Sequence, residues 1–533
     1  MITKINIQGY RIYKDFVLHP NPKLNLIVGA NESGKSTLIE AISLALTGRI
    51  NGRKASEELN PYWFNSILVQ EFVDNRASGG KQAFPIIKIE LFFEGNDELQ
   101  ELCGAHNSDI PTNACPGIKM EIMPNPEYAS DLDIWAQSPS LILPTDYYMV
   151  DWRPFNDIPI TRQPKKLATA IIDSRTVRST SGVDYHLREI LNDYLDPAER
   201  VAISQEFRQV KASMSNESLK DVNKRIGKLH ASLHDKPISL AMDQSARTTW
   251  ESSITPHVDS VPFPMSGQGQ QAAIKISLAM SKHSDKASFV MVEEPENHLS
   301  HTSLTTLLSR MEELSGEQQQ IFISTHSSFV LNRLGLDSIL LLGGIKAEKI
   351  SNLTPDTVAY FKKLPGYDTL RLALAKKVVL VEGPSDEILF ERLFKDAYGK
   401  LPMQMGIDVL SMRGLSLKRC LEFCAALDKP VAALRDNDGH DPTTLTSELE
   451  KWLDGGKRKV FIGDPKCGNT LEPQLLFFNS EESLRKILGI TAHADINKWM
   501  AREKTEAAIR IAESEFSITP PDYIKQAVSF IHG

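Results

Sequence analysis

The chain contains 533 residues, of which 41% are hydrophobic and 24% are charged. This composition is ordinary for a folded globular protein, and the length exceeds what a single core usually supports, so we expect roughly two or three domains. The formal net charge of -8 excludes a uniformly basic nucleic-acid binder. Any basic surface must therefore be local.

The sequence also bounds the cellular setting. The first residues lack the layout of a signal peptide, and no run of about 18 apolar residues predicts a membrane span. The five cysteines are odd in number and lack paired CxxC spacing, which favours a reduced compartment over a disulfide framework or a zinc site. We therefore expect a cytoplasmic protein with no membrane partner.

The N-terminal part is predicted to begin as strand, strand, glycine-rich loop and helix. The apolar run from Leu24 to Val28 predicts a buried strand, and helical periodicity follows from Thr37 to Leu46. From about residue 60 to 160 the pattern is strand-like, and residues 86–93 alternate most clearly. Strand patterns return at residues 288–292 and 321–324.

The rest of the chain suggests an insert, a connector and a second domain. Apolar spacing is helical between about residues 184 and 236, so we predict a helical insert over 165–250 between two halves of one domain, 1–164 and 251–345. The insert lacks sustained heptads, which favours dimerisation over a long coiled arm. After a connector at 346–376, short strand patterns at 378–381, 409–411, 431–434 and 460–462 predict a small α/β domain over 377–533.

A phosphate-binding loop stands between the first predicted buried strand and helix. Residues 29–36 read GANESGKS and match GxxxxGK[ST] without a gap, in the strand-to-helix context that this motif requires. Glycines let backbone N–H groups and the helix N-terminus face a phosphate chain. Lys35 is expected to neutralise the β- and γ-phosphates of ATP, and Ser36 to ligate Mg²⁺. The predicted nucleotide-binding residues of this loop are Gly29, Asn31, Gly34, Lys35, Ser36 and Thr37.

Two acids follow the apolar strand at residues 289–292. One carboxylate at a strand end can hold Mg²⁺ through water, and the next can polarise the attacking water. We assign the first role to Glu293 and the second to Glu294. An acidic turn alone would usually be a solvated loop, but its position after a buried strand and a phosphate loop favours the functional interpretation.

Two further segments indicate the subtype of ATPase. Ser266 and Gly267 open a helical segment before the acidic strand, and His326 follows the strand at 321–324. This order resembles the ABC ATPase family, including its SMC-type and RecF-like branches. The resemblance implies that Ser266 and Gly267 contact the γ-phosphate bound by another subunit and that His326 senses it. The segment departs from the common LSGGQ signature at Gln268, and His326 could instead be structural.

A second group of carboxylates follows predicted strands in the C-terminal domain. Glu382 comes directly after an apolar strand and Asp386 four residues later, while Asp436 and Asp438 follow another strand. If these strands are neighbours in one sheet, the acids lie close together and repel one another unless a cation sits among them. Oxygen-only ligands favour Mg²⁺ or Mn²⁺. Such a cluster suits displacement at phosphorus.

The spacing of these acids resembles the Toprim fold, and an ABC head followed by Toprim resembles the OLD (overcoming lysogenisation defect) family. The segments that carry the resemblance are GANESGKST, EEPENHL, STHS, VEGPSD and DND. Relatives include the nuclease subunit of Gabija antiphage defence and some retron effectors. The resemblance implies that Glu472, in a TLE segment, joins the metal site and that Lys504 stabilises charge on the scissile phosphate. The implied metal ligands are Glu382, Asp386, Asp436, Asp438 and Glu472, with Ser36 in the head.

The predicted fold class is α/β, an ABC-type ATPase head with an inserted helical dimerisation segment, followed by a Toprim α/β domain. The resemblance implies an ATP-regulated, Mg²⁺- or Mn²⁺-dependent DNA endonuclease or nickase acting in antiphage defence. Its implied catalytic residues are Glu382, Asp436 and Lys504, with Glu294 in the ATPase. The expected partners are DNA, a homodimer or higher oligomer, and a helicase-like protein or a retron nucleic acid. Two alternatives stay open: a repair or recombination ATPase whose Toprim domain binds DNA without cutting, and an accessory ATPase that acts through assembly.

Overall fold

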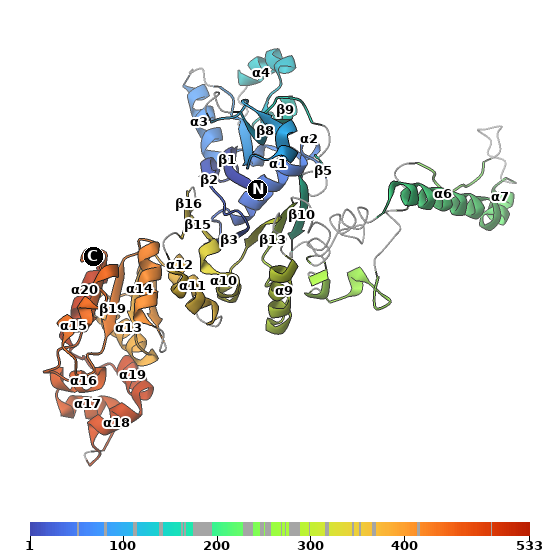
Figure 1. Cartoon of the computed structure of the whole chain (residues 1–533). Coiled ribbons are helices and arrows are strands. Elements are labelled where there is room, and N and C mark those ends of the chain that lie inside the picture. The colour runs from blue at the N-terminus through green and yellow to red at the C-terminus, as the bar shows by residue number, and fades with distance from the viewer. Residues whose placement is uncertain are drawn as a thin grey trace. The chain divides into compact units, whose positions relative to one another are not determined.

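The structure is a computed structural model of the whole chain (Figure 1). It describes residues 1–50, 53–78, 83–109, 114–137, 142–160, 164, 167–173, 195–227, 238–245, 250, 257–267, 269–271, 273–274, 276, 288–297, 299–314, 319–343, 346–350, 353–364, 369–412, 416–491 and 493–533. The chain divides into two compact units. The first comprises Met1–Ile27, Asn31–Thr325 and Leu342–Ala347, and the second comprises Val28–Ala30, His326–Leu341 and Glu348–Gly533.

An antiparallel sheet forms one layer of the first unit. Its strands are β1 (Ile2–Tyr10), β2 (Tyr13–Leu18), β6 (Ile87–Phe93), β7 (Cys103–Gly104), β8 (Cys115–Pro124) and β9 (Tyr148–Pro154). They run in the order β2-β1-β6-β8-β7, with β9 also paired to β8. Alternate residues of these strands face the core, including Ile5, Ile7, Ile89 and Leu91, which are fully buried.

A second, largely parallel sheet carries the segments that the sequence predicts to bind nucleotide. Its strands are β3 (Leu24–Gly29), β10 (Ala168–Asp173), β13 (Ser288–Glu293), β14 (Gln319–Ser324), β15 (Ile339–Gly343) and β16 (Lys346–Lys349). The order is β10-β13-β14-β3-β15-β16, and β10, β13, β14 and β3 pair in parallel. These apolar strands confirm the sequence-based predictions at 24–28, 288–292 and 321–324.

Helix α1 (Lys35–Thr47) packs between the two sheets of the first unit (Figure 1). It contacts β1, β6 and β8 on one side and β10 and β14 on the other. Ten of its thirteen residues are buried, because a helix covered on both sides must be apolar around most of its circumference. The phosphate loop is therefore anchored to the most buried helix of this unit.

The strand-like interpretation of residues 60–160 is wrong in two places. Helix α3 (Ser66–Ala77) begins at Asn65, whose side chain accepts hydrogen bonds from the amides of Ile67 and Leu68. This cap satisfies N–H groups that a helix start would otherwise leave unpaired. Helix α4 (Ala129–Ala136) follows the next turn. Shorter elements of the region are β4 (Arg49–Ile50), β5 (Arg53–Lys54) and α2 (Ala55–Glu58).

The region predicted as an insert contains both a strand and helices. It opens with β10, which pairs with β13 and so extends the parallel sheet. The helices described within it are α6 (Pro197–Ser213) and α7 (Lys220–Ile226), whereas the helical pattern at 184–194 lies outside the described residues. Asp196 and Glu199 form a capping box at the start of α6. Beyond this region lie β11 (His257–Val258), β12 (Val261–Pro262) and α9 (His301–Leu314).

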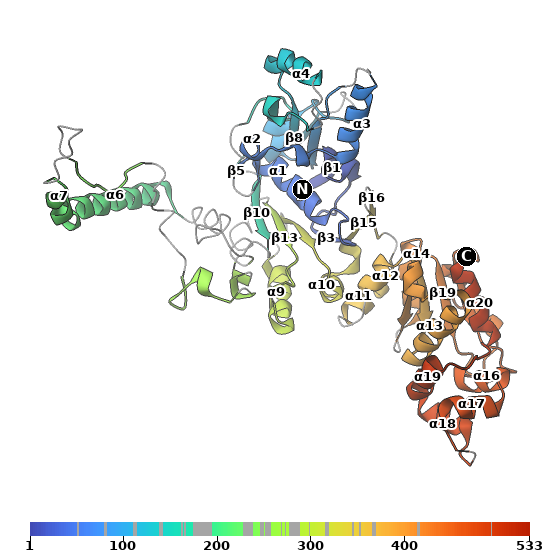
Figure 2. The ribbon, with the colours of Figure 1, turned by 180° about the vertical axis from the view of Figure 1, so that it is seen from behind.

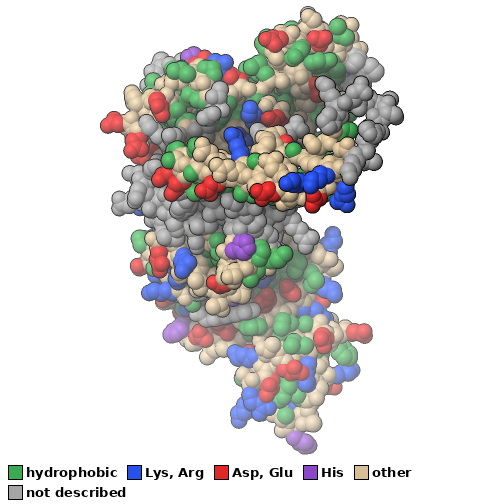
Figure 3. All heavy atoms as spheres, turned by 90° about the vertical axis from the view of Figure 1, so that its right-hand side faces the viewer, with side chains coloured by type: hydrophobic (Ala, Val, Ile, Leu, Met, Phe, Trp, Pro, Cys, Tyr) green, Lys and Arg blue, Asp and Glu red, His purple; other side chains and the backbone are tan. Residues whose placement is uncertain are grey.

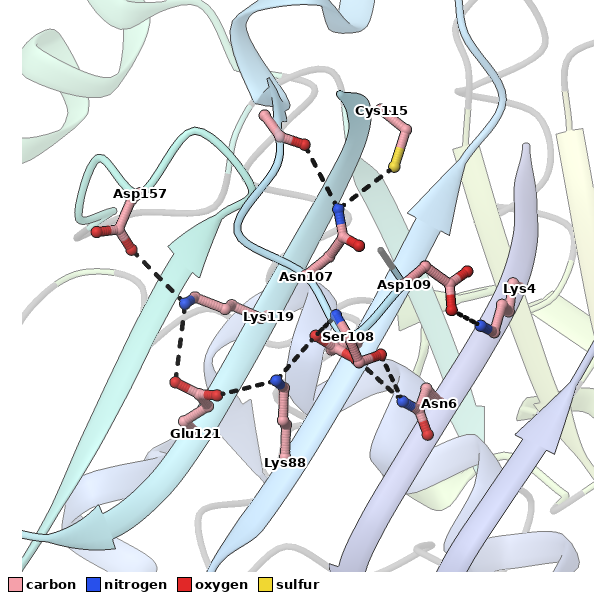
Figure 4. Close-up of polar contacts among 12 residues, drawn as sticks. Lys4, Asn6, Lys88, Asn107, Ser108, Asp109, Cys115, Lys119, Glu121 and Asp157 are labelled. Carbon is pink, nitrogen blue, oxygen red and sulfur yellow. Dashed lines mark hydrogen bonds and ion pairs between the residues drawn. The ribbon is translucent and has the colours of Figure 1, made fainter. Parts of the chain in front are cut away.

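Charged side chains form a network on the polar face of the antiparallel sheet (Figure 4). Glu90 is fully buried and accepts hydrogen bonds from Asn6 Nδ2 (3.0 Å) and the Ser108 amide (2.9 Å). Lys88 Nζ lies 3.2 Å from Glu90 and 3.3 Å from Glu121. A charge buried with several partners stabilises a fold only while all the partners remain.

We expect Glu90→Ala to lower the free energy of unfolding by about 3 kcal/mol, because it leaves buried donors and Lys88 without their carboxylate. Glu121→Ala is the matched control, since Glu121 sits on the same face but is partly exposed, and its loss should cost less than about 1 kcal/mol. Denaturant unfolding followed by circular dichroism measures both. Equal effects of the two variants would contradict the assigned importance of Glu90.

The second unit is built on a four-stranded parallel sheet (Figure 2). Its strands are β17 (Lys377–Val381), β18 (Ile407–Ser411), β19 (Val431–Arg435) and β20 (Arg458–Ile462), in the order β18-β17-β19-β20. All four strands predicted from apolar runs are present. Because the strands are parallel, their carboxyl ends lie at the same edge of the sheet.

Helices surround this sheet and complete the second unit. They are α10 (Ser328–Leu334), α11 (Pro355–Lys362), α12 (Thr369–Leu374), α13 (Pro384–Tyr398), α14 (Leu417–Ala426), α15 (Pro442–Ser447), α16 (Leu471–Phe478), α17 (Glu481–Leu488), α18 (Ile496–Arg502), α19 (Lys504–Glu513) and α20 (Asp522–His532). One core joins Val379 and Val381 of β17 to residues of α13 and α16 to α20. The predicted connector is tied to the sheet domain, because the buried Glu422 accepts hydrogen bonds from the Thr354 amide and the Thr357 hydroxyl.

The face of the molecule drawn in Figure 3 carries charges of both signs. In the view of Figure 3, Lys and Arg side chains are interspersed with Asp and Glu. No helix in the described ranges is both long and apolar enough to cross a membrane.

Candidate functional site

Gly34, the last glycine of the phosphate loop, has a backbone conformation that only glycine can adopt at this position. Gly34 precedes α1 with φ of 96°. A Cβ atom there would lie 2.5 Å from both the Ile12 Cδ1 atom and the Tyr13 hydroxyl. Both the positive φ and the close approach exclude a side chain. Lys35, the next residue, is 94% buried at the start of the helix (6% exposed).

Tyr13 supports this loop and was not identified from the sequence. Its side chain is fully buried, and its hydroxyl donates a hydrogen bond of 3.1 Å to the Gly34 carbonyl. Burial raises the pKa of Tyr13 well above its ordinary value, so the phenol keeps the proton that it donates. Only the fold brings β2 next to the loop, and no local motif marks the tyrosine.

The structure brings together two predicted magnesium ligands of the nucleotide site. The Ser36 hydroxyl donates a hydrogen bond of 3.0 Å to Glu293 Oε2. Glu293 ends β13 and is buried, while Ser36 lies in the first turn of α1. A hydroxyl and a carboxylate in contact at this position fit the oxygen ligands that a nucleotide-bound Mg²⁺ requires.

Glu294 lies beyond the end of β13 in a strained backbone conformation. Its φ is 46°, its amide donates to the Ser324 carbonyl at the end of β14, and its carboxylate accepts from Asn297 Nδ2 at 2.7 Å. A positive φ in a residue other than glycine costs energy and often marks a functional position. Backbone and side-chain contacts therefore fix the position of Glu294, and its role in polarising water stays a prediction.

The other residues predicted to bind nucleotide differ in how far they are buried. Ser266 is half-buried and accepts a hydrogen bond on its carbonyl from Gln271 Nε2, and Gly267 is exposed with open space around it. His326 is half-buried directly after Thr325. Gly29 and Thr37 are buried and Asn31 is exposed. The roles of Ser266, Gly267 and His326 toward a second subunit stay predictions.

We expect Tyr13→Phe to weaken ATP binding by about fivefold, because the loop carbonyl loses a buried hydrogen bond worth about 1 kcal/mol. Tyr148→Phe is the matched control, since Tyr148 is also buried and its hydroxyl donates 3.1 Å to the Pro85 carbonyl. Titration with a fluorescent ATP analogue gives the affinities. If both variants bind ATP like the wild type, Tyr13 does not support the loop.

The second group of carboxylates lies at the carboxyl edge of the parallel sheet in the second unit. Glu382 follows β17, Asp436 follows β19, and the Asp436 amide donates a hydrogen bond of 3.1 Å to Glu382 Oε1. Asp386 lies in the first turn of α13, where its carboxylate accepts from the Gly383 amide at 2.9 Å. Neighbouring parallel strands therefore bring together acids that are far apart in the chain.

Glu472 and Lys504 join the same site. Glu472 is buried near the start of α16 and accepts a hydrogen bond from the Thr470 hydroxyl. Lys504 opens α19, and its Nζ lies 3.2 Å from Glu472 Oε1. The structure thus pairs the glutamate and the lysine that the family resemblance implied.

The pKa values of these groups reflect their burial first and then the repulsion between neighbouring carboxylates. Burial, followed by the charges of Glu382, Asp386 and Glu472, raises the pKa of Asp436 to about 8. Burial also raises the pKa of Asp386 to about 6, and the charges of Glu382 and Glu472 add to this effect. Burial lowers the pKa of Lys504, but Glu472, Asp436 and Asp386 act together against it, so that the pKa of the lysine is raised.

The donors are carboxylates, the type of ligand that a divalent cation such as Mg²⁺ or Mn²⁺ prefers. Burial first, and then the charge of the exposed Asp438, raise the pKa of Glu382, whereas the hydrogen bond from the Asp436 amide lowers it. As they stand, no three acidic, histidine or cysteine side chains within the described ranges lie close enough to share one ion. Oxygen ligands that repel one another are nevertheless what Mg²⁺ or Mn²⁺ would hold together.

Tyr523 is a further residue at this site that sequence reasoning missed. It is buried at the start of α20. Its pKa is raised well above the ordinary value by burial first and then by the charges of nearby carboxylates, Asp436 foremost. Its distance along the chain from every acidic motif left no local signal. Because the phenol is buried and neutral, it is poorly suited to act as a nucleophile.

Comparison with known proteins assigns a domain type to each part of the chain. An AAA domain model matches residues 4–250, and an Overcoming lysogenization defect protein-like TOPRIM domain model matches residues 374–438. Endonuclease GajA of Bacillus cereus is 29% identical over 192 residues, which cover 33% of each protein. OLD nuclease of Thermus scotoductus is 28% identical over 200 residues, which cover 34% of this chain and 37% of that protein. The chain thus spans about a third of the length of the curated relatives it matches.

Solved structures show weaker similarity. The recombination mediator RecF bound to ATP is 12% identical, with a TM-score of 0.34 over 66% of this chain and 99% of that chain. The C-terminal region of the Burkholderia pseudomallei OLD protein is 21% identical, with a TM-score of 0.26 over 30% and 97%. Likenesses this weak add nothing to the assignment, which rests on the family models and the strand order.

The chain therefore joins an AAA-type ATPase domain to a Toprim domain, which confirms the predicted α/β class with these two domains, whereas the helical dimerisation segment stays a prediction. Its Toprim part is OLD-like, and the curated relatives that it resembles are named as nucleases.

Proposed function

We propose that this protein is an ATP-binding, metal-dependent DNA endonuclease or nickase whose cutting site is the carboxylate cluster of the second unit. The observation that carries the proposal is the meeting of Glu382, Asp386, Asp436 and Glu472 with Lys504 at one sheet edge. The nuclease names of relatives that match about a third of their length support the same conclusion.

The cluster offers the groups that phosphodiester hydrolysis needs. Glu382, Asp386, Asp436, Asp438 and Glu472 would hold Mg²⁺ or Mn²⁺. When bound, the ion supplies an activated water and steadies the leaving oxygen. Lys504 presents its ammonium group beside Glu472, where it would stabilise the negative charge that develops on the phosphate. Tyr523 is buried and therefore poorly placed to attack the phosphate itself, so we propose water as the nucleophile.

The first unit would bind and hydrolyse ATP. Lys35 would neutralise the phosphates, Ser36 and Glu293 would hold Mg²⁺, and Glu294 would polarise the attacking water. The proposed head comprises residues 1–164 and 251–345, with the insert at 165–250, the connector at 346–376 and the Toprim domain at 377–533. Within the proposed insert, β10 extends the sheet of the head. Ser266, Gly267 and His326 would complete the ATP site across a homodimer.

We expect Glu382→Ala to reduce nicking of supercoiled plasmid in Mg²⁺ or Mn²⁺ to background, because the metal loses a central ligand. Glu481→Ala, which removes an exposed carboxylate of α17 in the same unit, should nick like the wild type. Glu382→Ala should also keep its ATP affinity, because it lies in the other domain. Lys35→Ala should abolish any effect of ATP on nicking, because the phosphates lose their neutralising charge.

Two outcomes of this assay would count against the proposal. Equal nicking by the wild type and Glu382→Ala would mean that a contaminant cuts the plasmid. No nicking with either ion, with or without ATP, would favour a repair ATPase that binds DNA without cutting or an accessory ATPase.

The biological role that we propose is antiphage defence, which rests on the OLD-family resemblance alone. Cells that express the wild-type protein should form fewer phage plaques than cells that express Glu382→Ala at the same level. Equal plaque numbers across a panel of phages would argue against defence while leaving the nuclease proposal intact.

A further inference from the structure

Asn437 lies between two of the proposed metal ligands, Asp436 and Asp438, yet its side chain is fully buried. The turn that holds it has two successive residues with positive φ, Asp438 at 48° and Gly439 at 81°. Asn437 Oδ1 accepts a hydrogen bond of 2.8 Å from the Gly439 amide. The side chain is therefore directed into the protein and fixes the turn from within.

The amide group of Asn437 also binds the neighbouring loop. Its Nδ2 atom donates to the Gly463 carbonyl at 3.0 Å and to the Gly468 carbonyl at 2.8 Å. These carbonyls belong to the loop between β20 and α16, and α16 begins one residue before Glu472. One side chain thus connects the turn after β19 to the loop that carries the next carboxylate.

Two further hydrogen bonds join the same segments. The Asp438 amide donates to the Asn469 carbonyl at 3.2 Å, and Gln474 Nε2 donates to the Gly468 carbonyl at 3.0 Å. The loop fits closely around Gln474, since a Cβ atom on Gly463 would lie 1.8 Å from its Nε2 atom. The two carboxylate-bearing segments therefore form one hydrogen-bonded assembly.

Asparagine has the donors and the acceptor that this position requires. An amide supplies two N–H donors and a carbonyl acceptor, and the bonds to Gly463, Gly468 and Gly439 use all of them. Aspartate would supply no donor and would add a charge beside the cluster. Alanine would leave the buried Gly463 carbonyl without this donor, at a cost in free energy of folding, and would leave the Gly468 carbonyl with only the bond from Gln474 Nε2. Metal ligands need their positions fixed to about 0.5 Å by such supporting contacts.

We propose that Asn437 is a positioning residue that locks the Asp436–Asp438 turn to the Glu472 loop and thereby sets the divalent-ion affinity of the cluster. The inference rests on the proposed function in that it takes these carboxylates as the metal site. It does not require that the bound metal cuts DNA.

The test measures Mn²⁺ binding to the nucleotide-free full chain by electron paramagnetic resonance, with thermal unfolding in parallel. Glu382→Ala identifies the part of the signal that belongs to the cluster. We expect Asn437→Ala to weaken Mn²⁺ binding there by at least about tenfold, the usual effect of losing a residue that orients metal ligands.

Asn479→Ala is the matched control. Asn479 Nδ2 also donates to two backbone carbonyls, of Leu475 and Thr519 at 2.9 Å each, and its Oδ1 accepts from the Thr519 amide. It lies after the opposite end of α16 from Glu472. This variant should lower the melting temperature yet keep Mn²⁺ affinity within about twofold, because it orients no metal ligand. If Asn437→Ala does not fold, Asn437→Ser, which keeps one hydroxyl donor, takes its place in the same comparison.

The possible results separate this inference from the nuclease proposal. Wild-type affinity in Asn437→Ala, equal loss in Asn479→Ala, or no Mn²⁺ bound by the wild-type cluster would each overturn the positioning role. Selective loss in Asn437→Ala supports it, even if the wild-type protein binds Mn²⁺ and leaves plasmid uncut. That last result would contradict only the nuclease proposal.

Discussion

The second unit holds several carboxylates at one edge of a parallel sheet. The repulsion between them is the main constraint on this part of the structure. Glu382 and Asp436 follow adjacent strands, so the backbone holds them close together despite the repulsion between their negative charges. The cost appears in the pKa of Asp436, which burial and its neighbours raise to about 8. The apolar core around Val379 and Val381 offsets this cost, and the positive charges of Arg435 and Lys504 partly compensate the acids.

The first unit also places acids at the end of a buried parallel strand, but with fewer acids close together. Glu293 and Glu294 also follow a buried parallel strand, and there the partner is the hydroxyl of Ser36 rather than another acid. In this unit the main constraint is the backbone of the phosphate loop. It requires glycine at position 34, where φ is 96°, and a fixed position for the start of α1. Burial of α1 between two sheets provides that support.

Sequence analysis succeeded where a local pattern and its structural context coincide. Apolar runs followed by acids marked β13, β17 and β19, because a buried parallel strand has few polar residues until it ends. Glu472 and Lys504 came from family resemblance, and the structure pairs them. The domain models that match the two parts support the predicted class of protein.

The missed features depend on contacts between distant segments. Tyr13, Asn437 and Tyr523 act through neighbours that only the folded chain brings to them. Helix α3 was missed because its apolar residues are spread around the helix rather than gathered on one face, and because its start depends on the cap at Asn65. The strand β10 was placed in a helical insert because six residues are too few for a periodicity to stand out.

Because the strands of the sheet in the second unit are parallel, the proposed metal ligands and the turns that precede the strands lie at opposite edges of that sheet. Every proposed ligand that follows a strand lies at the carboxyl edge, so the turns at the opposite edge are spared from the reaction. The turn before β20 contains Gly455 and Gly456, and a Cβ atom on either glycine would meet open space. A fluorophore or affinity handle inserted between these glycines would report on the Toprim domain while leaving its carboxylates undisturbed.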